Sequence, residues 1–494
     1  PEDQPIAALQ KEQLTINMAT ARAIGLSPSF DVLGDAVLLN RVAAAEGDEY
    51  GLVEIARMAI EQNQDLRAET YGVQAGLEEI ARARANLRPQ IGASAGHTVR
   101  KDSPSVSAGV FAERSNDATL SINQLLYSDA ASGNLKIQKA LQESRLASLE
   151  EFKLDVVLAA TTSYYAVLNA RSQLAVQENN LRISQANLEL AENRVSIGSS
   201  TAADVYRWQA EVARAQVLVL NQRAAENQAY ETLSRVLHKP QGVRLALREA
   251  SFDEPFVMTR EEFDQLVTSP ADYATFSRFY IDRALRQAPE LEQLNAQIDA
   301  KRRDLTSQKR AYWLPDVSIS GGYSSNLGQS GLGAGPSAGE DLNDWSVGIQ
   351  ATLPLFSGGL KKANVSRASF ELRQLESLRL SAEERVEESV RNQLHAVQAA
   401  YAQIQLTAIA ADASRKNFEL VSDAYARGAV NVIELLDAQD TSLTAAAASA
   451  ESLYFFLTEI MVLQRAVGGF DYLLPPAERS ALAAEFRRTL TGTE

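Results

Sequence analysis

Carboxylates are the main side chains of this sequence that could take part in a reaction or bind an ion. Few other reactive groups accompany them. The chain has no cysteine, which excludes disulfides, thiolate metal sites and thiol nucleophiles. Its three histidines, His97, His238 and His395, share no ligand-like spacing, so we expect no metal site and no cofactor. No carboxylate forms a recognisable arrangement with a histidine or a nucleophile, which argues against an enzyme.

The acidic residues that stand out lie in a duplicated stretch of the chain. Residues 184–209 and 414–439 match in register at an offset of about 230 residues, which indicates an internal duplication. Each stretch reads as a helix end, a glycine-marked turn and a helix start. Matched positions pair Gly198 with Gly428 and Asp204 with Glu434, and a further acid, Asp437, follows in the second stretch.

Charge and hydropathy limit the possible partners. The formal net charge of -15 at pH 7 would repel phosphates, so we expect no nucleic acid partner, and it suits high solubility or a conduit that favours cations. No run of about 18 apolar residues occurs, so the sequence predicts no transmembrane helix. The chain opens at Pro1 without a visible signal peptide, as a processed or trimmed protein would, and without the cysteine of a lipid anchor.

The predicted secondary-structure elements around these residues occur in the same order twice along the chain. Helix formers, alternating apolar and polar residues, and long helical stretches follow one another in each round. The first structural repeat, 51–240, contains strands at about 90–99 and 117–127 and a helical hairpin at 133–238 with its tip near residue 198. The second repeat, 281–467, contains strands at about 316–325 and 344–353 and a helical hairpin at 360–467 with its tip near residue 428.

Three further segments surround the repeats. Residues 1–50 have weak periodicity and are predicted to form an N-terminal extension with room for one short helix. Residues 241–280 carry scattered prolines and are predicted to be an irregular equatorial insert between the repeats. The C-terminal tail, 468–494, has no clear role.

Two apolar seams run along the first long helix. One series repeats every seven residues, and a second is displaced from it by two residues, which places it about 160° away around the helix. Two nearly opposite seams indicate a neighbour on each side, as for a helix in the wall of a cylinder. A helix buried inside a soluble bundle is the alternative. The series are Val167, Leu174, Leu181, Leu188 and Val195, and Val176, Ile183, Leu190 and Ile197.

The four predicted strands alternate apolar and polar side chains, as expected between lipid and a wet lumen. Four strands cannot close a barrel, because bacterial outer-membrane barrels start at about eight strands. Closure therefore requires further copies of the chain. Trp345, at the start of its strand, occupies the place of a membrane-interface aromatic or of a core residue.

The order of helix, hairpin, long helix, turn and helix, occurring twice, resembles the TolC family of trimeric outer-membrane efflux and export channels over about residues 50–467. The resemblance implies a mainly α fold with a small β part, in which a trimer forms a 12-stranded transmembrane β-barrel continued by a 12-helix α-barrel tunnel. It also implies a Gram-negative outer-membrane location with the tunnel in the periplasm, contact with outer-membrane lipid, and two partners, a periplasmic adaptor and an inner-membrane transporter.

By the same resemblance, Glu434 and Asp437 take the places of the acidic residues that ring the periplasmic constriction, where three copies would favour cations. Equally, two acids in the first turn of a helix complement its dipole. Asp204 and Tyr425 match the family's gate latch, and the turns at Gly198 and Gly428 match the tips that an adaptor contacts.

Two residues depart from the family pattern. Val430 stands where the best-known members carry an arginine that ties the latch, which argues against a salt-bridged lock. Glu434 replaces the commoner aspartate. We expect the second turn to line the throat, because it carries both acids, and the first turn to brace it from outside.

The leading hypothesis is therefore a passive exit duct for drugs or for secreted protein, gated at its periplasmic tip and opened by partners. The alternative is a soluble coiled-coil scaffold with the β-hairpins as docking flaps. The scaffold predicts that the protein is extracted into buffer without detergent.

Overall fold

The structure is a computed structural model, and it describes residues 15–17, 37–39, 49–108, 110–242, 244–250, 270–335 and 343–491. The described residues are mainly helical with a small β part, which confirms the predicted fold class at that level. Two compact units divide the chain. The tip unit comprises Pro1–Leu66, Phe152–Ala288 and Val386–Glu494, and the sheet unit comprises Arg67–Glu151 and Pro289–Arg385.

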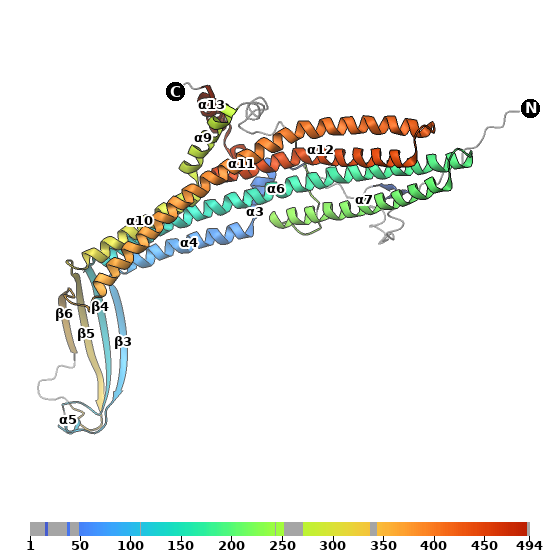
Figure 1. Ribbon diagram of the computed structural model, residues 1–494. Coiled ribbons are helices and arrows are strands. Elements are labelled where there is room, and N and C mark those ends of the chain that lie inside the picture. Colours follow the sequence, from blue (N-terminus) through green and yellow to red (C-terminus); the bar gives the residue numbers. More distant parts are fainter. Residues whose placement is uncertain are drawn as a thin grey trace, which may run out of the picture. The chain divides into compact units, whose positions relative to one another are not determined.

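The two repeats have the same order of elements, and each is a helix, two strands and two long helices (Figure 1). The first consists of α4 (Gln64–Ala85), β3 (Gln90–Val99), β4 (Arg114–Tyr127), α6 (Asp129–Ser196) and α7 (Ala202–Val236). The second consists of α10 (Pro289–Arg310), β5 (Asp316–Ser330), β6 (Asn343–Thr352), α11 (Leu360–Ala426) and α12 (Val432–Val467). Both α6 and α11 begin in the sheet unit and end in the tip unit.

The helix-forming stretch that precedes the first long strand forms two helices rather than one. α3 (Leu52–Gln62) ends at Asn63, whose backbone is extended, and α4 follows at once. The buried Asn63 side chain accepts a hydrogen bond from the Leu66 N–H at 2.8 Å and donates one to the Val236 carbonyl at 3.3 Å. Because neither proline nor glycine marks this break, propensity alone does not predict it.

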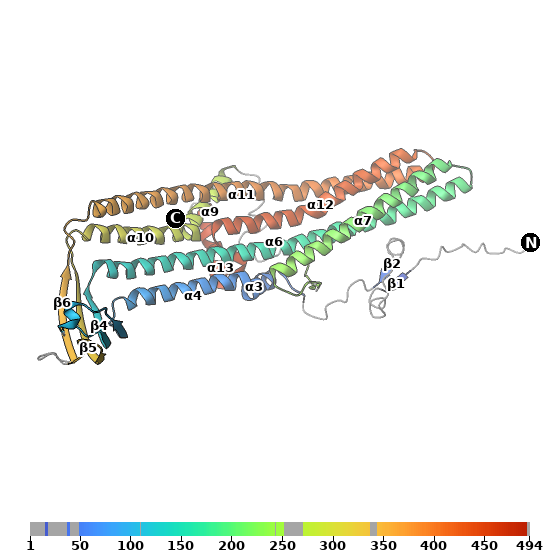
Figure 2. The same ribbon diagram turned by 90° about the horizontal axis from the view of Figure 1, so that it is seen from below.

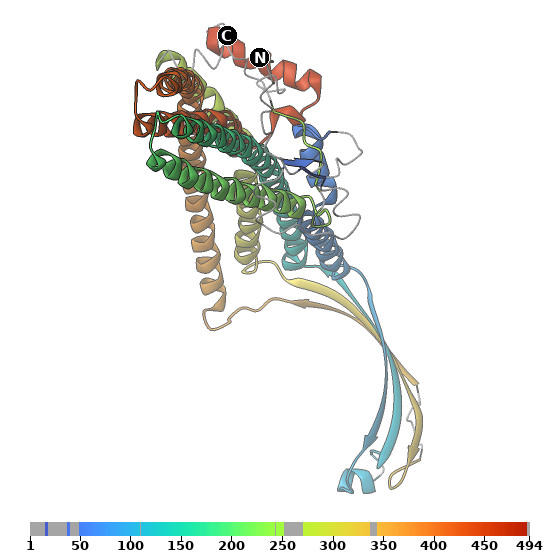
Figure 3. The ribbon, with the colours of Figure 1, turned by 90° about the vertical axis from the view of Figure 1, so that its right-hand side faces the viewer.

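The sheet is a single antiparallel layer in the order β3-β4-β5-β6 (Figure 3). Both β4 and β5 are longer than predicted, since β4 begins at Arg114 and β5 extends to Ser330. Polar residues beyond the predicted bounds pair as well, since Asn326 pairs with Asp117 and Gln329 with Ser115. Backbone hydrogen bonds form the ladder, so polar side chains do not prevent the pairing. A short helix, α5 (Pro104–Ser107), lies in the β3–β4 connection.

One face of the sheet is apolar and exposed. The register places Ile91, Ile122, Gly321 and Val347 in one cross-strand row and Ala93, Leu120, Tyr323 and Trp345 in the next. The opposite face carries a row of Gly92, Ser121, Gly322 and Ser346. Within the described chain, β3 and β6 are the edges of this sheet and each pairs on one side only.

Helix α6 has neighbours on two sides within the tip unit (Figure 2). On one side Gln222 of α7 donates to the Ala170 carbonyl, and on the other Gln173 of α6 donates to the Ala447 carbonyl of α12. The seam residues Val167 and Leu174 are buried. Helix α6 therefore contacts α7 and α12 within one chain, whereas Ile197, at the end of the second seam, is 77% exposed.

Helix α12 passes a hydropathy test for membrane-spanning helices, although the sequence contains no uninterrupted apolar run of about 18 residues. An 18-residue window of α12 has a mean hydropathy of 1.3, so by length and composition this helix qualifies. It passes because the test averages hydropathy over the window, and the small alanines around Ala445 raise that mean. Phe456, Leu457 and Met461 are buried in the tip unit, and a core helix passes the same test.

The predicted irregular insert and tail contain further helices. α9 (Pro270–Gln287) packs against α13 (Pro476–Thr491), where the buried Phe486 ring lies 5.1 Å from the Phe276 ring. A 3-10 turn, η1 (Asp471–Leu473), places Asp471 2.8 Å from Arg283. In the N-terminal extension, β1 (Thr15–Asn17) pairs in parallel with β2 (Val37–Leu39), and the predicted short helix lies outside the described residues.

Candidate functional site

The two helical turns of the tip unit have the same backbone. Gly198 and Gly428 adopt φ angles of 74° and 76°, which only glycine adopts without strain. In the first turn the Ser199 N–H donates to the Arg194 carbonyl at 2.8 Å, and in the second the Ala429 N–H donates to the Ala424 carbonyl at 2.8 Å. Each bond satisfies a carbonyl at the end of a helix. The duplication seen in sequence is therefore a duplication of turn geometry.

The helix starts after the two turns differ. Asn431 accepts hydrogen bonds from the N–H groups of Ile433 and Glu434, at 2.9 and 3.1 Å, and donates one to the Glu434 carboxylate at 2.8 Å. Thr201, at the start of α7, makes no such side-chain cap, and Ser200 instead donates to Asp204 at 2.5 Å. The second turn is thus the better capped, and its cap orients Glu434.

Glu434 and Asp437 are both exposed on the first turns of α12. Glu434 therefore does complement the helix start, as one of the two interpretations of these acids requires. Exposure of both carboxylates also leaves them able to face a lumen.

Tyr425, a predicted latch residue, is the centre of a buried cluster that joins the two turns. Its ring is 1% exposed and packs with Trp208, which is fully buried, and with Ala191, Val432 and Leu435. α6 and α7 supply Ala191 and Trp208, whereas the other members come from α11 and α12. Figures 1 and 2 both show the two turns side by side. Sequence patterns did not identify Trp208, because the matching position of the second stretch is an alanine, Ala438.

Arg194 is the residue that sequence reasoning missed most clearly. Its guanidinium donates to the Tyr425 carbonyl at 2.5 Å and lies 4.4 Å above the centre of the Tyr425 ring. A second bond, at 3.4 Å, reaches the Ser199 carbonyl of its own turn. An arginine thus joins the two turns, although the position where the family carries its latch arginine is Val430 in this chain. Arg194 binds through a hydrogen bond to a carbonyl and a cation–π contact rather than through a salt bridge.

Asp204 lies close enough to Tyr425 to influence its titration. Burial raises the pKa of the Tyr425 hydroxyl above its usual value, and the negative charge of Asp204 raises it further, whereas Trp208 and Arg194 lower it. The Tyr425 hydroxyl is buried without a well-aligned hydrogen bond. The structure therefore brings the two predicted latch residues together in one chain, in an environment that keeps the phenol neutral.

A buried polar network lies one helical turn beyond the cluster. The Gln439 amide donates to Asn180 and Ser184, both at 2.8 Å, and accepts from Asn187 at 3.1 Å. All four residues are buried, so these bonds form in a low dielectric, where leaving one unmade is costly. Asn180 and Ser184 lie between the two seams of α6, and their spacing does not reveal a partner on α12, more than 250 residues away in sequence.

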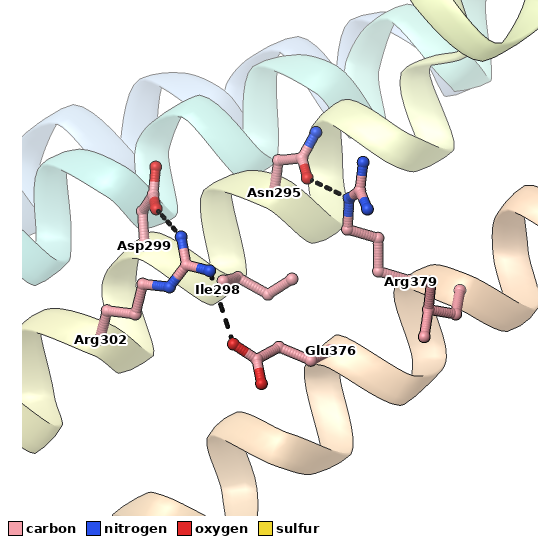
Figure 4. A pocket seen from close by; sticks show the side chains of 7 residues that line it. Asn295, Ile298, Asp299, Arg302, Glu376 and Arg379 are labelled. Carbon is pink, nitrogen blue, oxygen red and sulfur yellow. Dashed lines mark hydrogen bonds and ion pairs between the residues drawn. The ribbon is translucent and has the colours of Figure 1, made fainter.

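Other candidate sites are weaker. A polar hollow of about 490 Å³ lies between α10 and α11 in the sheet unit (Figure 4). Its charges are paired internally, since Arg302 bonds to Asp299 at 3.4 Å and to Glu376 at 3.5 Å, and Arg379 bonds to Asn295 at 2.6 Å. Among the described residues no group of three or more histidine, cysteine or acidic side chains could hold a metal ion.

Comparison with known proteins adds the family. The sequence matches the outer membrane efflux protein family over residues 55–237 and 280–469. It is 25% identical over 448 residues to the alkaline protease secretion protein AprF of Pseudomonas aeruginosa, across 88% of this chain and 87% of the relative. It is 22% identical over 427 residues to the outer membrane protein TolC of Vibrio cholerae, across 84% and 90%. The outer-membrane channel OprN has the same fold, with a TM-score of 0.69 at 19% identity over 86% of this chain and 91% of OprN.

Proposed function

The chain belongs to the outer membrane efflux protein family, and from this premise we propose that it is a passive exit duct for tripartite efflux or type I secretion. It is located in the outer membrane of a Gram-negative bacterium. The duct is a homotrimer, its strands close a 12-stranded barrel, and its helices form a periplasmic tunnel. A periplasmic adaptor and an inner-membrane pump open it, and the chain itself performs no reaction.

The observation that carries the proposal is the incomplete sheet. Its two edge strands, β3 and β6, each pair on one side, and its apolar face is exposed, with Ile91 and Ile349 both at 71%. A soluble scaffold would have to leave this face in water, whereas in a barrel it faces lipid and the polar face lines the lumen. Three copies supply the strands that closure needs.

Helix α11 supports the same assembly. On one side it bonds to α12, where Thr407 donates to Ser452 at 3.2 Å. Elsewhere along its length Leu406, Ile409 and Leu420 are more than half exposed. Apolar side chains on a helix that already has one neighbour are expected to pack against another, and in the proposed trimer a second copy provides it.

The gate lies at the paired turns. Tyr425, Asp204 and Arg194 hold the second turn against the first, and separation of the turns opens the throat. Glu434 and Asp437, exposed on α12, bring six carboxylates into the constriction of a trimer and favour cations. The turns at Gly198 and Gly428 receive the adaptor. Similarity to a protease secretion protein and membership of the outer membrane efflux protein family are both compatible with such a gate, so the proposal covers both kinds of cargo.

Planar-bilayer recording of the purified full chain tests this function. The account predicts a trimer by mass that conducts weakly, and a several-fold larger conductance when Trp208→Ala loosens the turns. Tyr206→Ala is the matched control, because Tyr206 lies on the same helix but is 68% exposed. A wild type and a Trp208→Ala variant that both insert and are both silent would contradict the proposal.

A further inference from the structure

In the sheet unit α6 lies against α4 and α10, and α10 lies against α11, but this last interface is built differently from the other two. A glycine lets the helices approach closely at each α6 interface, because a methyl group at Gly76 would overlap Gln142 and one at Gly133 would overlap Ser307. Neither α10 nor α11 as far as Arg385 contains a glycine. Between these two helices lies the polar hollow of about 490 Å³ (Figure 4).

Long polar side chains bridge the α10–α11 interface. Three bonds cross it, each donated by a cation: Lys301 to Glu371 at 2.8 Å, Arg302 to Glu376 at 3.5 Å, and Arg379 to Asn295 at 2.6 Å. The charged side chains among them are 27% to 58% exposed, so water and salt screen their charges. Exposed ion pairs of this kind contribute little to stability.

Each of these three cations also has an acidic partner on its own helix. The distances are 3.2 Å from Lys301 to Asp304, 3.4 Å from Arg302 to Asp299, and 2.9 Å from Arg379 to Glu383. On the other side, Glu371 lies 3.9 Å from Arg367 of its own helix. If α10 and α11 separate, every cation therefore keeps an acid beside it. Opening this interface exposes no unpaired cation, and closing it again needs only an exchange of partners.

The α6–α10 interface lacks such spare partners. Asp129, at the start of α6, is 10% exposed and lies 3.1 Å from Arg303 and 2.8 Å from Arg310, both on α10. The rest of the first turn of α6, residues 130–133, contains no cation. Separation of these helices would leave the carboxylate without either arginine, and breaking a buried ion pair is strongly unfavourable. The structure thus has a fixed interface and an exchangeable one on the two sides of α10.

We propose that the α10–α11 interface is a compliant joint. The two helices move apart and together as their ion pairs exchange between partners across the interface and partners on the same helix, while α4, α6 and α10 stay together. The consequence for transport rests on the proposed function. In a trimeric duct, three such joints let the tunnel wall next to the barrel widen around a bulky cargo and narrow again after it has passed.

Spin labels measure this joint directly, because the chain has no cysteine of its own. One full-length chain carries Glu292→Cys on α10 with Glu384→Cys on α11, and another carries Glu292→Cys with Glu143→Cys on α6, all at exposed positions. An excess of unlabelled chain limits the distances to pairs within one copy. The Debye length falls from about 10 Å at 0.1 M salt to about 3 Å at 1 M, so we expect the Glu292–Glu384 distance distribution to become about twofold broader and the Glu292–Glu143 distribution to stay unchanged.

Two double variants test whether the ion pairs control the joint. Glu371→Gln with Glu376→Gln removes both acids across the interface, and it should give the broad Glu292–Glu384 distribution already at 0.1 M salt. Arg302→Leu with Glu376→Leu instead places apolar side chains beside the buried Ile298, which lines the hollow. This second variant should keep the distribution narrow at both salt concentrations, because apolar contacts are not screened.

Arg82→Leu with Glu79→Leu is the control, because it removes an ion pair within α4 and should change neither distance. A Glu292–Glu384 distribution that ignores salt, or equal broadening at both label pairs, would overturn the joint. The labels report whether or not the channel conducts. A wild type and a Trp208→Ala variant that are both silent but have a salt-responsive joint would contradict the proposed function and keep the joint, and an unresponsive joint in a conducting channel would do the reverse.

Discussion

The two turns of the tip unit share a backbone and differ in what their side chains do. Both end a helix with a glycine at positive φ and the same carbonyl bond. The first turn supplies the groups that hold, Arg194 and Trp208, and the second supplies the group that is held, Tyr425, together with the exposed acids. Duplication thus preserved the backbone geometry while the side chains diverged: those of the first turn pack against Tyr425, and Glu434 and Asp437 of the second are exposed.

Removal of the largest brace residue should have the largest effect. Trp208→Ala leaves a cavity beside Tyr425, and loss of a buried tryptophan costs about 3–5 kcal/mol. We expect hydrogen exchange to accelerate in both turns, since both pack on this side chain. Tyr206→Ala, at an exposed position, should change neither turn. Faster exchange in the first turn alone would show that the turns are not joined through Trp208.

Disruption of the buried polar network around Gln439 should have the second-largest effect. Gln439→Ala leaves Asn180, Ser184 and Asn187 without their shared partner, and unsatisfied buried groups cost about 1–3 kcal/mol each before water relieves them. Exchange in α12 should rise more than in α7, because the network joins α12 to α6. A control at Gln403→Ala, an exposed position of α11, should be neutral. Unchanged exchange in α12 would mean that the apolar cluster alone holds the helices together.

Arg194 tests whether charge or shape holds the turns. Arg194→Gln loses the cation–π contact and a charge-assisted bond, for a cost of about 2 kcal/mol, and should raise the open probability in bilayers. Arg194→Lys keeps the charge and should recover only part of the closure, because an ammonium lacks the planar fork. Arg207→Gln, at an exposed position of α7, is the control. Full recovery by lysine would show that charge alone suffices.

The glycines should give the smallest and most equal effects. Gly198→Ala and Gly428→Ala each place a side chain at positive φ, which costs about 1 kcal/mol. Equal acceleration of exchange in the two turns would sharpen the conclusion that their backbones are equivalent. Gly72→Ala, inside α4 with open space around it, should be neutral or slightly stabilising. Unequal costs at the two turns would break the equivalence.

Much of the fold could be predicted from local sequence patterns, because strands and turns each have a characteristic pattern of residues. Alternation located the strands, and glycine located both turns. The missing parts depend on tertiary contacts. Asn63 ends a helix through a bond to Val236, and polar side chains such as Ser184 become buried because a glutamine from the other repeat reaches them. One weak signal in the sequence points to the role of Arg194: the matching position of the second stretch is Ala424, so the arginine is specific to the first turn.

The central claim is that the second turn faces the throat and the first does not, and ion selectivity tests it directly. In the conducting Trp208→Ala background, reversal potentials in a salt gradient are compared after Glu434→Ala with Asp437→Ala, and after Glu189→Ala with Glu192→Ala, two exposed acids of α6. The account predicts that only the first pair of substitutions weakens cation preference. Equal losses from both pairs, or no loss from Glu434 and Asp437, would contradict it.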